Sequence, residues 1–233
     1  LKVNNPKPWT AETPNLYDIQ LTLTQNTKKI DRVIQKIGLR EIEVIGPDIF
    51  VNGKEIRITG VARHDLWPTV GRAIGPEISE KDIIMMKKAG VNAVRTAHHT
   101  SEKSFIELAD KYGLYIFDNI AMSNLVERKL NDPNYLPGAI LRTEETIARD
   151  ILNPSVLVWT IGNENYMGYL HKPMYDKIKA MDKTRPALMP WYFGDANFPE
   201  LNSVHYPKPF RLMTVLTDFP DRPLVCTEYQ HCG

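Results

Sequence analysis

The stretch "VLVWTIGNENYMG", residues 156–168, decides the fold of this chain. Six residues that are apolar except for Thr160 run directly into Gly162, Asn163 and Glu164. A short, continuous apolar run is typical of a strand that is buried on both faces, as in a parallel sheet. Glu164 then stands at the carboxyl end of that strand, where it either carries chemistry or marks the return of the chain to water.

Apolar strands alternate with amphipathic helices over most of the chain after residue 55. We predict seven strands, near residues 57–62, 92–97, 114–118, 156–161, 187–191, 202–206 and 223–228. We predict helices over residues 78–90, 101–113, 141–152 and 174–183, the first with Ser79 as its N-cap. Strands that are separated by helices indicate parallel βαβ units.

Two parallel architectures fit this alternation, a doubly wound sheet and a barrel. Polar residues follow most of the strands, and a barrel brings all strand ends to one mouth, whereas a doubly wound sheet uses mainly its switch point. These residues are Arg63-His64, Arg95 and His98, Asp118-Asn119, Asn163-Glu164, His205-Tyr206 and Glu228-Tyr229. We therefore predict an α/β fold, an incomplete (β/α)8 TIM barrel with about seven strands.

The first 46 residues have a different pattern. "LYDIQLTLTQ" (16–25) alternates apolar and polar side chains, and "NTKK" (26–29) offers a turn before a second extended segment. Two or three strands cannot close a sandwich by themselves. Residues 1–46 are therefore an incomplete β unit, which the family resemblance given below implies to be the end of a β-sandwich, and residues 47–233, which open with a hairpin around Asn52-Gly53, form the barrel.

The overall composition excludes several classes of partner. The net charge of the 233 residues is +1, so no excess of charge predicts binding to nucleic acid or to a membrane surface. We find no apolar run near 18 residues, which argues against a membrane span. The two cysteines have no metal-ligand spacing, and Gly-rich phosphate loops are absent, so we predict no cofactor.

Glu164 and Glu228 end strands four and seven of the predicted barrel, so they face each other across the mouth. Two such carboxyl groups suit glycoside hydrolysis, in which one donates a proton and the other attacks or activates water. Partial burial behind the apolar strand would keep Glu164 neutral, while Arg95 and Tyr206 would keep Glu228 ionised. Position alone leaves open that either Glu merely ends a strand at the surface.

The chain also resembles glycoside hydrolase family 2, the group that contains β-galactosidases, β-glucuronidases and β-mannosidases. "PWTAETPNLYDIQLTL" and "QKIGLREIEV" resemble the end of the immunoglobulin-like sandwich of that family. The barrel resemblance rests on "FVNGKEIRITGVARHD", "GVNAVRTAHH", "YGLYIFDN", "NPSVLVWTIGNEN" and "RPLVCTEYQH". The match spans nearly the whole chain but lacks the family's jelly-roll domain and eighth strand, so we expect a fragment of a longer chain.

The resemblance implies a retaining mechanism with named roles. Glu164 would be the general acid/base, and Glu228 would be the nucleophile that forms a glycosyl-enzyme. Asn163 would bind the sugar 2-hydroxyl, and Tyr206 would support the nucleophile. His64, Arg95 and His98 would line the sugar subsite. The implied partner is a carbohydrate, and a homo-oligomer is compatible with the sequence.

Within the family, "CTEYQHCG" (226–233) looks most like the nucleophile segment of β-galactosidases, so the expected substrate is a terminal β-galactoside. Galactosidases with a magnesium site have a carboxylate and a His where this chain has Ser123 and Leu125, so we predict no metal. The loop "NYMGYLHKP" (165–173) differs from that of better-known galactosidases. Alternatives are a β-glucuronidase or another family-2 glycosidase acting on polysaccharide-derived oligosaccharides, a non-catalytic carbohydrate-binding fragment, and a metal-dependent barrel enzyme.

Overall fold

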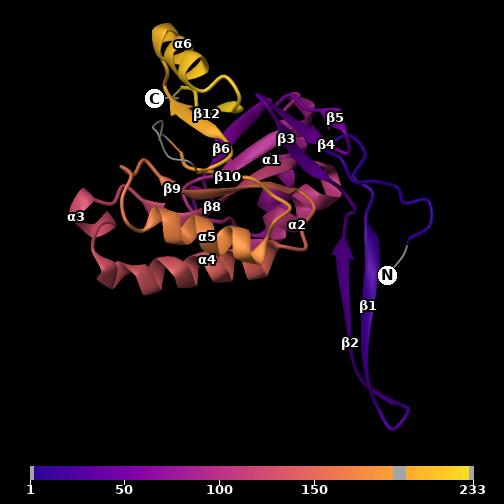
Figure 1. Ribbon diagram of the computed structural model, residues 1–233. Coiled ribbons are helices and arrows are strands. Elements are labelled where there is room, and N and C mark those ends of the chain that lie inside the picture. The colour runs from indigo at the N-terminus through magenta and orange to yellow at the C-terminus, as the bar shows by residue number, and fades with distance from the viewer. Residues whose placement is uncertain (1–2, 191–197, 231–233) are drawn as a thin grey trace.

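The computed structural model of the chain describes residues 3–190 and 198–230. Seven strands form a curved parallel layer, with helices packed on its outer side (Figure 1). In chain order these strands are β6 (Gly60–Arg63), β7 (Ala93–Thr96), β8 (Tyr115–Ser123), β9 (Val156–Asn163), β10 (Ala187–Leu188), β11 (Asn202–His205) and β12 (Leu224–Glu228). Each of the seven lies where the sequence predicts a strand.

The spatial order of the strands follows the chain, as a barrel requires. Strands β6 to β10 are hydrogen-bonded in the order β10-β9-β8-β7-β6, and β11 pairs with β12, all in parallel. A parallel bridge between Leu188 and Leu201 joins the two groups, and β12 comes close to β6. The prediction of an incomplete (β/α)8 barrel, rather than a doubly wound sheet, is therefore confirmed.

The continuously apolar strands separate two cores, because successive side chains point to opposite faces. Ile116 and Trp159 face the helices, and the Trp159 indole donates to Asp182 Oδ2. Tyr115 and Phe117 face the interior of the barrel. Arg95, Asn119 and Asn163 also point inward, but they lie nearer the carboxyl ends of their strands. The interior is thus apolar at one end and polar at the other, where the candidate site lies.

A small antiparallel sheet and Trp9 close the apolar end. The sheet consists of β3 (Ile42–Ile45), β4 (Asp48–Val51) and β5 (Lys54–Glu55). Asn52 and Gly53 form its tight turn with φ values of 53° and 71°, which confirms the predicted hairpin. Trp9 packs edge-on against Tyr115, with ring centroids 5.8 Å apart.

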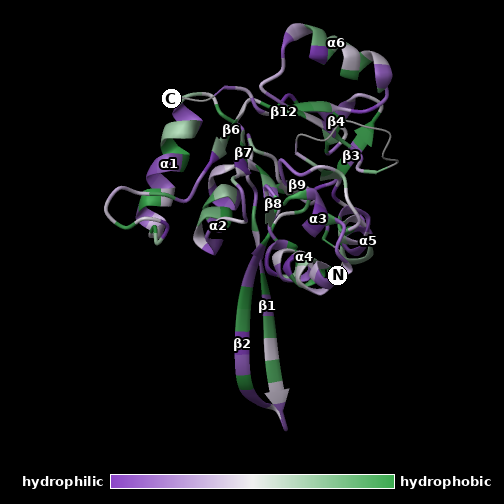
Figure 2. Ribbon diagram, turned by 90° about the vertical axis from the view of Figure 1, so that its left-hand side faces the viewer, coloured by the Kyte–Doolittle hydropathy of each residue, from purple (hydrophilic) through white to green (hydrophobic). Residues whose placement is uncertain are grey.

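Strands β1 (Tyr17–Gln25) and β2 (Lys28–Ile37) form an antiparallel hairpin that projects from the body as a separate arm (Figure 1). Figure 2 shows green and purple residues interspersed along it, and large apolar side chains such as Leu21 and Val33 are exposed. These two strands have the alternating pattern that the sequence predicts, but neither face of the hairpin is buried along its length.

The helices begin and end at slightly different residues from those predicted. They are α1 (Pro76–Lys88), α2 (Lys103–Tyr112), α3 (Glu127–Leu130), the 3-10 helix η1 (Pro133–Tyr135), α4 (Leu136–Asp150), α5 (His171–Met181) and α6 (Pro209–Asp218). The prediction of Ser79 as an N-cap is wrong: Gly75 is the N-cap of α1, and Ser79 is buried inside the helix. Pro76, whose fixed φ suits the first helical position, starts α1 earlier. The sequence predicts none of α3, η1 and α6.

In the described parts of the chain, each helix is too short or too polar to cross a lipid bilayer.

Candidate active site

The end of β9 turns Asn163 and Glu164 into the mouth of the barrel. Gly162 has a φ of 68°, and a Cβ there would overlap the carbonyl oxygen of Met122 on the neighbouring strand. Glu164 has a φ of 48°, in the left-handed region that non-glycine residues seldom adopt. Tyr206, directly after β11, has a φ of 44°. A left-handed conformation of a non-glycine residue, as at Glu164 and Tyr206, costs about 1–3 kcal/mol and is often found at functional sites.

Arg95 is the central cation of this mouth and is almost fully buried. Its Nη1 donates to Glu228 Oε1 at 2.8 Å, and its Nη2 donates to Asn163 Oδ1 at 2.6 Å. Nη2 also lies 3.4 Å from Asn119 Oδ1 and 3.3 Å from His98 Nδ1. One guanidinium from β7 therefore connects β8 with the carboxyl ends of β9 and β12.

The surroundings of Glu228 favour its ionised form. Burial alone would raise the pKa of Glu228, but hydrogen bonds from the Tyr206 hydroxyl and from Arg95 outweigh that effect and lower it. Tyr206 donates to Oε2 and Arg95 donates to Oε1, so each carboxylate oxygen has its own donor. Glu228 is thus kept as a carboxylate, as the sequence hypothesis expects.

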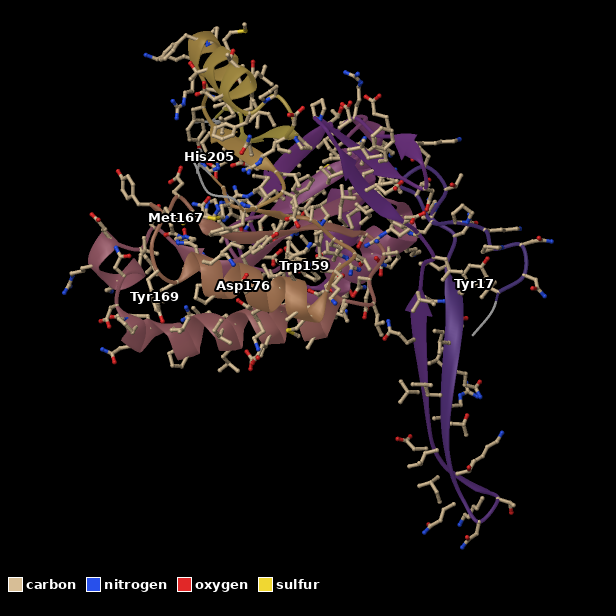
Figure 3. All side chains as sticks on the ribbon, viewed as in Figure 1. Tyr17, Trp159, Met167, Tyr169, Asp176 and His205 are labelled. Atoms are coloured by element: carbon tan, nitrogen blue, oxygen red, sulfur yellow. The ribbon has the colours of Figure 1, made fainter. Side chains whose placement is uncertain are left out.

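Glu164 lies opposite, with a side chain that is 30% exposed. Its Oε1 is 3.0 Å from His205 Nδ1, and His205 Nδ1 is 3.6 Å from Glu228 Oε1. Carboxylate oxygens of Glu164 and Glu228 lie within 4.8 Å of each other. Figure 3 places the labelled His205 at the carboxyl end of the sheet, below α6 and on the opposite side from the arm.

His64 and His98 form an edge-on pair, with ring centroids 4.9 Å apart. Burial, followed by the charge of Arg95, lowers the pKa of His98 to about 4. Burial, followed by the charge of Arg72, also lowers the pKa of His64. Both rings are therefore neutral near pH 7, and a neutral imidazole can both donate to and accept from hydroxyl groups.

A cavity of about 970 Å3 connects several of these residues. His64, Arg95, His98, Tyr206 and Glu228 line it, together with the exposed edges of β6 and β12. The structure thus brings together all seven residues that the sequence selects: Glu164, Glu228, His64, Arg95, His98, Asn163 and Tyr206.

Two further residues belong to the site but received no role from the sequence. His205 contacts Glu164, and Asn119 accepts from Arg95 and from Thr160 Oγ1 at 3.0 Å. Both had one sequence signal, since Asp118-Asn119 and His205-Tyr206 are among the polar pairs near the carboxyl ends of predicted strands. Which of two adjacent polar residues points inward depends on strand register, which the sequence does not show.

Ser123 and Leu125, at the positions expected to hold a metal in some relatives, make other contacts. Ser123 Oγ is 3.4 Å from Asn163 Nδ2, and the Leu125 backbone N–H donates to Asn165 Oδ1. Among the described residues, Glu164, His205 and Glu228 place three potential ligand atoms within 4.8 Å of one another. Arg95 contacts one of these atoms, so a cation there would face a buried positive charge.

The chain has clear relatives. Residues 42–232 match the family model of the TIM barrel domain of glycosyl hydrolases family 2, and residues 1–40 match the model of glycosyl hydrolases family 2. A beta-galactosidase of Lactococcus lactis subsp. lactis is 33% identical over 98% of this chain and 25% of its own length. A beta-galactosidase of Kluyveromyces lactis is 32% identical over 99% of this chain and 26% of its own length.

Solved structures with the same fold include a beta-D-glucuronidase from Dictyoglomus thermophilum. Its TM-score is 0.89 at 22% identity, over 97% of this chain and 45% of that protein. A GH2 beta-galacturonidase from Eisenbergiella tayi has a TM-score of 0.86 at 26% identity, over 97% of this chain and 44% of that protein. This chain spans about a quarter of the curated relatives that it matches. It belongs to family 2 of the glycosyl hydrolases and contains a large part of that family's TIM barrel domain.

Proposed function

We propose that the protein containing this chain is a retaining β-glycosidase that hydrolyses terminal β-galactosides. The observation that carries the proposal is the short separation of the two carboxyl groups, of which one oxygen each lies within 4.8 Å of the other. Retaining glycosidases have carboxyl groups about 5–5.5 Å apart, whereas inverting enzymes leave about 6.5–9.5 Å for a water molecule. The separation supports direct attack by one carboxylate on the sugar.

In the first step, Glu228 is the nucleophile. One of its carboxylate oxygens forms a bond to the anomeric carbon while the bond from that carbon to the leaving-group oxygen breaks. Glu164 donates its proton to that oxygen, so the aglycone departs as a neutral alcohol and Glu164 becomes a carboxylate. The donors Tyr206 and Arg95, which keep Glu228 ionised, make it ready for this attack.

In the second step, a water molecule attacks the anomeric carbon from the side that the aglycone left. Glu164 takes the proton of this water, the bond between the sugar and Glu228 breaks, and Glu228 returns to a carboxylate. Two inversions at one carbon give net retention. In this proposal Asn163, which Arg95 holds, binds the sugar 2-hydroxyl, and His64, Arg95 and His98 bind the other hydroxyls. The contact of Arg95 with Asn163 and the shared cavity support these roles.

A β-galactoside is the favoured substrate because relatives at 32–33% identity are named beta-galactosidases. A uronide is the second candidate, since the Eisenbergiella tayi relative at 26% identity is a beta-galacturonidase. A glucuronide and oligosaccharides derived from polysaccharides belong to the same test. We further propose that residues 1–46 are the end of the sandwich and 47–233 the barrel, with a carbohydrate as partner and no metal or other cofactor.

The test uses the complete natural protein that contains this chain. Turnover of p-nitrophenyl β-galactoside, β-glucuronide and β-galacturonide would be compared in the wild type, Glu164→Ala and Glu228→Gln. We expect Glu228→Gln to lower kcat/KM by about 10⁴-fold or more. Glu164→Ala should cost about 10²–10⁴-fold on substrates whose leaving group needs a proton. Glu43→Gln, an exposed residue of β3, is the matched control and should retain activity.

Azide separates the two carboxyl roles. In Glu164→Ala, azide can attack the glycosyl-enzyme from the vacated side and restore turnover, giving a β-glycosyl azide. Full activity in Glu228→Gln, or an α-configured azide from Glu164→Ala, would contradict the assignment. Sugar binding without any turnover by the wild-type protein would instead support the non-catalytic reading.

A further inference from the structure

His205 is buried between the two carboxyl groups, although its neighbour Tyr206 is exposed at the surface of the same mouth. It is the last residue of β11, and all four residues of that strand are buried. The register of β11 and β12 shifts between Val204 and His205, and after the shift His205 pairs with Glu228. This irregularity brings the imidazole into the barrel interior, beside both carboxylates.

Among the described residues, the carboxylate contacts of His205 are made by Nδ1. Nδ1 lies 3.0 Å from Glu164 Oε1 and 3.6 Å from Glu228 Oε1. In the part of the chain that the structure describes, the buried Nε2 has no hydrogen-bond partner. Among the described residues, the imidazole therefore makes its hydrogen bond to Glu164 through Nδ1.

These contacts assign the tautomer. A bare Nδ1 lone pair would face two carboxylate oxygens and be repelled, whereas an Nδ1–H can donate to them. Burial lowers the pKa of His205, against the opposing influence of Glu164 and Glu228, so the ring is neutral near pH 7. The group that faces Glu164 is thus a neutral N–H donor on a side chain with 0% exposure.

The remaining charged and titratable groups around His205 and Glu164 come from β7, from β12 and from the end of β11 itself. Arg95 projects from β7, with His98 just beyond its end, Glu228 ends β12, and Tyr206 follows β11. Arg95 and Tyr206 already donate to Glu228, one to each oxygen. His205, in contrast, makes its hydrogen bond to Glu164, so the two carboxylates have separate donors.

On the basis of the proposed glycosidase function, we propose that His205 is a positioning residue for Glu164. Its Nδ1–H holds the Glu164 carboxylate toward the reacting bond and stabilises the ionised form that must accept a proton from water in the second step. His205 itself neither gains nor loses a proton. It acts through Glu164, in the same way that Arg95 and Tyr206 act through Glu228.

A pair of amide substitutions tests this role. The amide nitrogen of His205→Asn occupies the place of Nδ1, so this variant keeps a donor to Glu164. The amide of His205→Gln occupies the place of Nε2, and His205→Leu keeps only the apolar bulk. In the complete protein, the alkaline limb of the kcat/KM profile reports ionisation of the acid/base. We expect this alkaline limb to move to higher pH by about one unit in His205→Gln and His205→Leu. In His205→Asn we expect it to move by less than about half a unit.

The kinetics of the second step give a separate readout. With a 2,4-dinitrophenyl glycoside, whose leaving group needs no proton, the second step limits kcat. We expect kcat to fall about tenfold in His205→Gln and His205→Leu, with KM falling in parallel as the glycosyl-enzyme accumulates. An unchanged alkaline limb in a folded His205→Gln would overturn the proposal, and so would equal shifts in His205→Asn and His205→Gln.

Infrared difference spectra keep the test independent of turnover. The carboxyl band that is present in the wild type and absent in Glu164→Gln identifies Glu164, and its titration midpoint is followed with pH. We expect this midpoint to rise in His205→Gln but to stay within half a unit, roughly, of the wild type in His205→Asn. If no glycoside is hydrolysed but the midpoint shifts as stated, the proposed function fails while the contact between His205 and Glu164 stands. If hydrolysis occurs and the midpoint does not move, the inference alone fails.

Discussion

Arg95 and Glu228 are 133 positions apart in the chain, and their side chains form an ion pair of 2.8 Å between Nη1 and Oε1. The pair joins β7 to β12, two strands that share no backbone hydrogen bond in the described sheets. The same guanidinium holds Asn163 at 2.6 Å. The position of the candidate nucleophile therefore depends on a cation that enters the barrel from the other half of the chain.

Replacing Arg95 should move the acid limb of the activity profile. Glu228 must be ionised to attack the sugar, and its pKa is lower than that of an ordinary Glu. Activity should therefore be lost only when the pH falls through this lowered pKa. In Arg95→Met the pKa of Glu228 should rise, so the acid limb should move up by about one pH unit or more. The measurement is kcat/KM against pH with an aryl glycoside. The control is Arg128→Met, a substitution at an exposed residue of α3. An acid limb that stays in place in Arg95→Met would refute the role of Arg95 in keeping Glu228 ionised.

Gly162 should tolerate no side chain. Its φ is 68°, and a Cβ would overlap the Met122 carbonyl oxygen and lie 2.5 Å from Asn165 Nδ2. We expect Gly162→Ala to lower the free energy of unfolding by at least about 2 kcal/mol. Gly138, in α4, has nothing within 4 Å of the corresponding position, so Gly138→Ala should be neutral or stabilising by about 0.5 kcal/mol. Thermal unfolding of both variants measures the difference, and equal effects would contradict this account.

Asp118 should make the protein less stable as the pH rises. It is buried between the sheet and the helices, and burial, followed by the charge of Asp150, raises its pKa to about 7. Because the folded-state pKa lies above the unfolded value near 4, its contribution to stability is complete below about pH 4 and is lost as the pH rises through about 7. Asp118→Asn should therefore raise Tm relative to the wild type at pH 8 but much less at pH 5.

The neighbouring carboxylate provides the contrast for that measurement. Asp150 is paired with Lys103 at 3.1 Å and with Arg149 at 2.5 Å. Asp150→Asn removes the partner of two cations and should lower Tm at both pH values. If Asp118→Asn behaved like Asp150→Asn, the charge of Asp118 would be stabilising rather than costly.

Chelation should leave activity unchanged. The Ser123 and Leu125 side chains offer one hydroxyl and no carboxylate or imidazole to a metal, and Ser123 contacts Asn163 instead. We expect kcat/KM after prolonged EDTA treatment and gel filtration to lie within about twofold of the untreated value. A loss that magnesium or manganese restores would overturn the prediction of a metal-free site and favour the metal-dependent alternative.

Much of the site could be predicted from strand ends. The stretch from Val156 to Glu164 shows both the buried strand and the place where it stops, and the stretch from Leu224 to Glu228 does the same. Parallel strands carry their residues to one end of a barrel, so the two Glu residues had to share a mouth once the architecture was recognised. That reasoning needs only periodicity and strand order, which are local properties of the chain.

The role of His205 could not be predicted in this way. The sequence places His205 and Tyr206 side by side at a strand end, and either could point inward. The register shift between β11 and β12 decides that His205 lies beside the carboxylates, and such a shift depends on how two strands pair. The start of α1 shows the same limit on a small scale, because Pro76 rather than Ser79 begins the helix.

By itself, the sequence determined the kinds of element, their order and the candidate carboxylates, because hydrophobic period and chain order are written along one dimension. Only the tertiary structure decided which donor contacts which carboxylate: Arg95 and Tyr206 on Glu228, and His205 on Glu164. Hydrogen bonds act over about 3 Å, and here they join residues that are 22, 41 and 133 positions apart in the chain. Their pairing follows from the closure of the sheet, which no single segment of the sequence encodes.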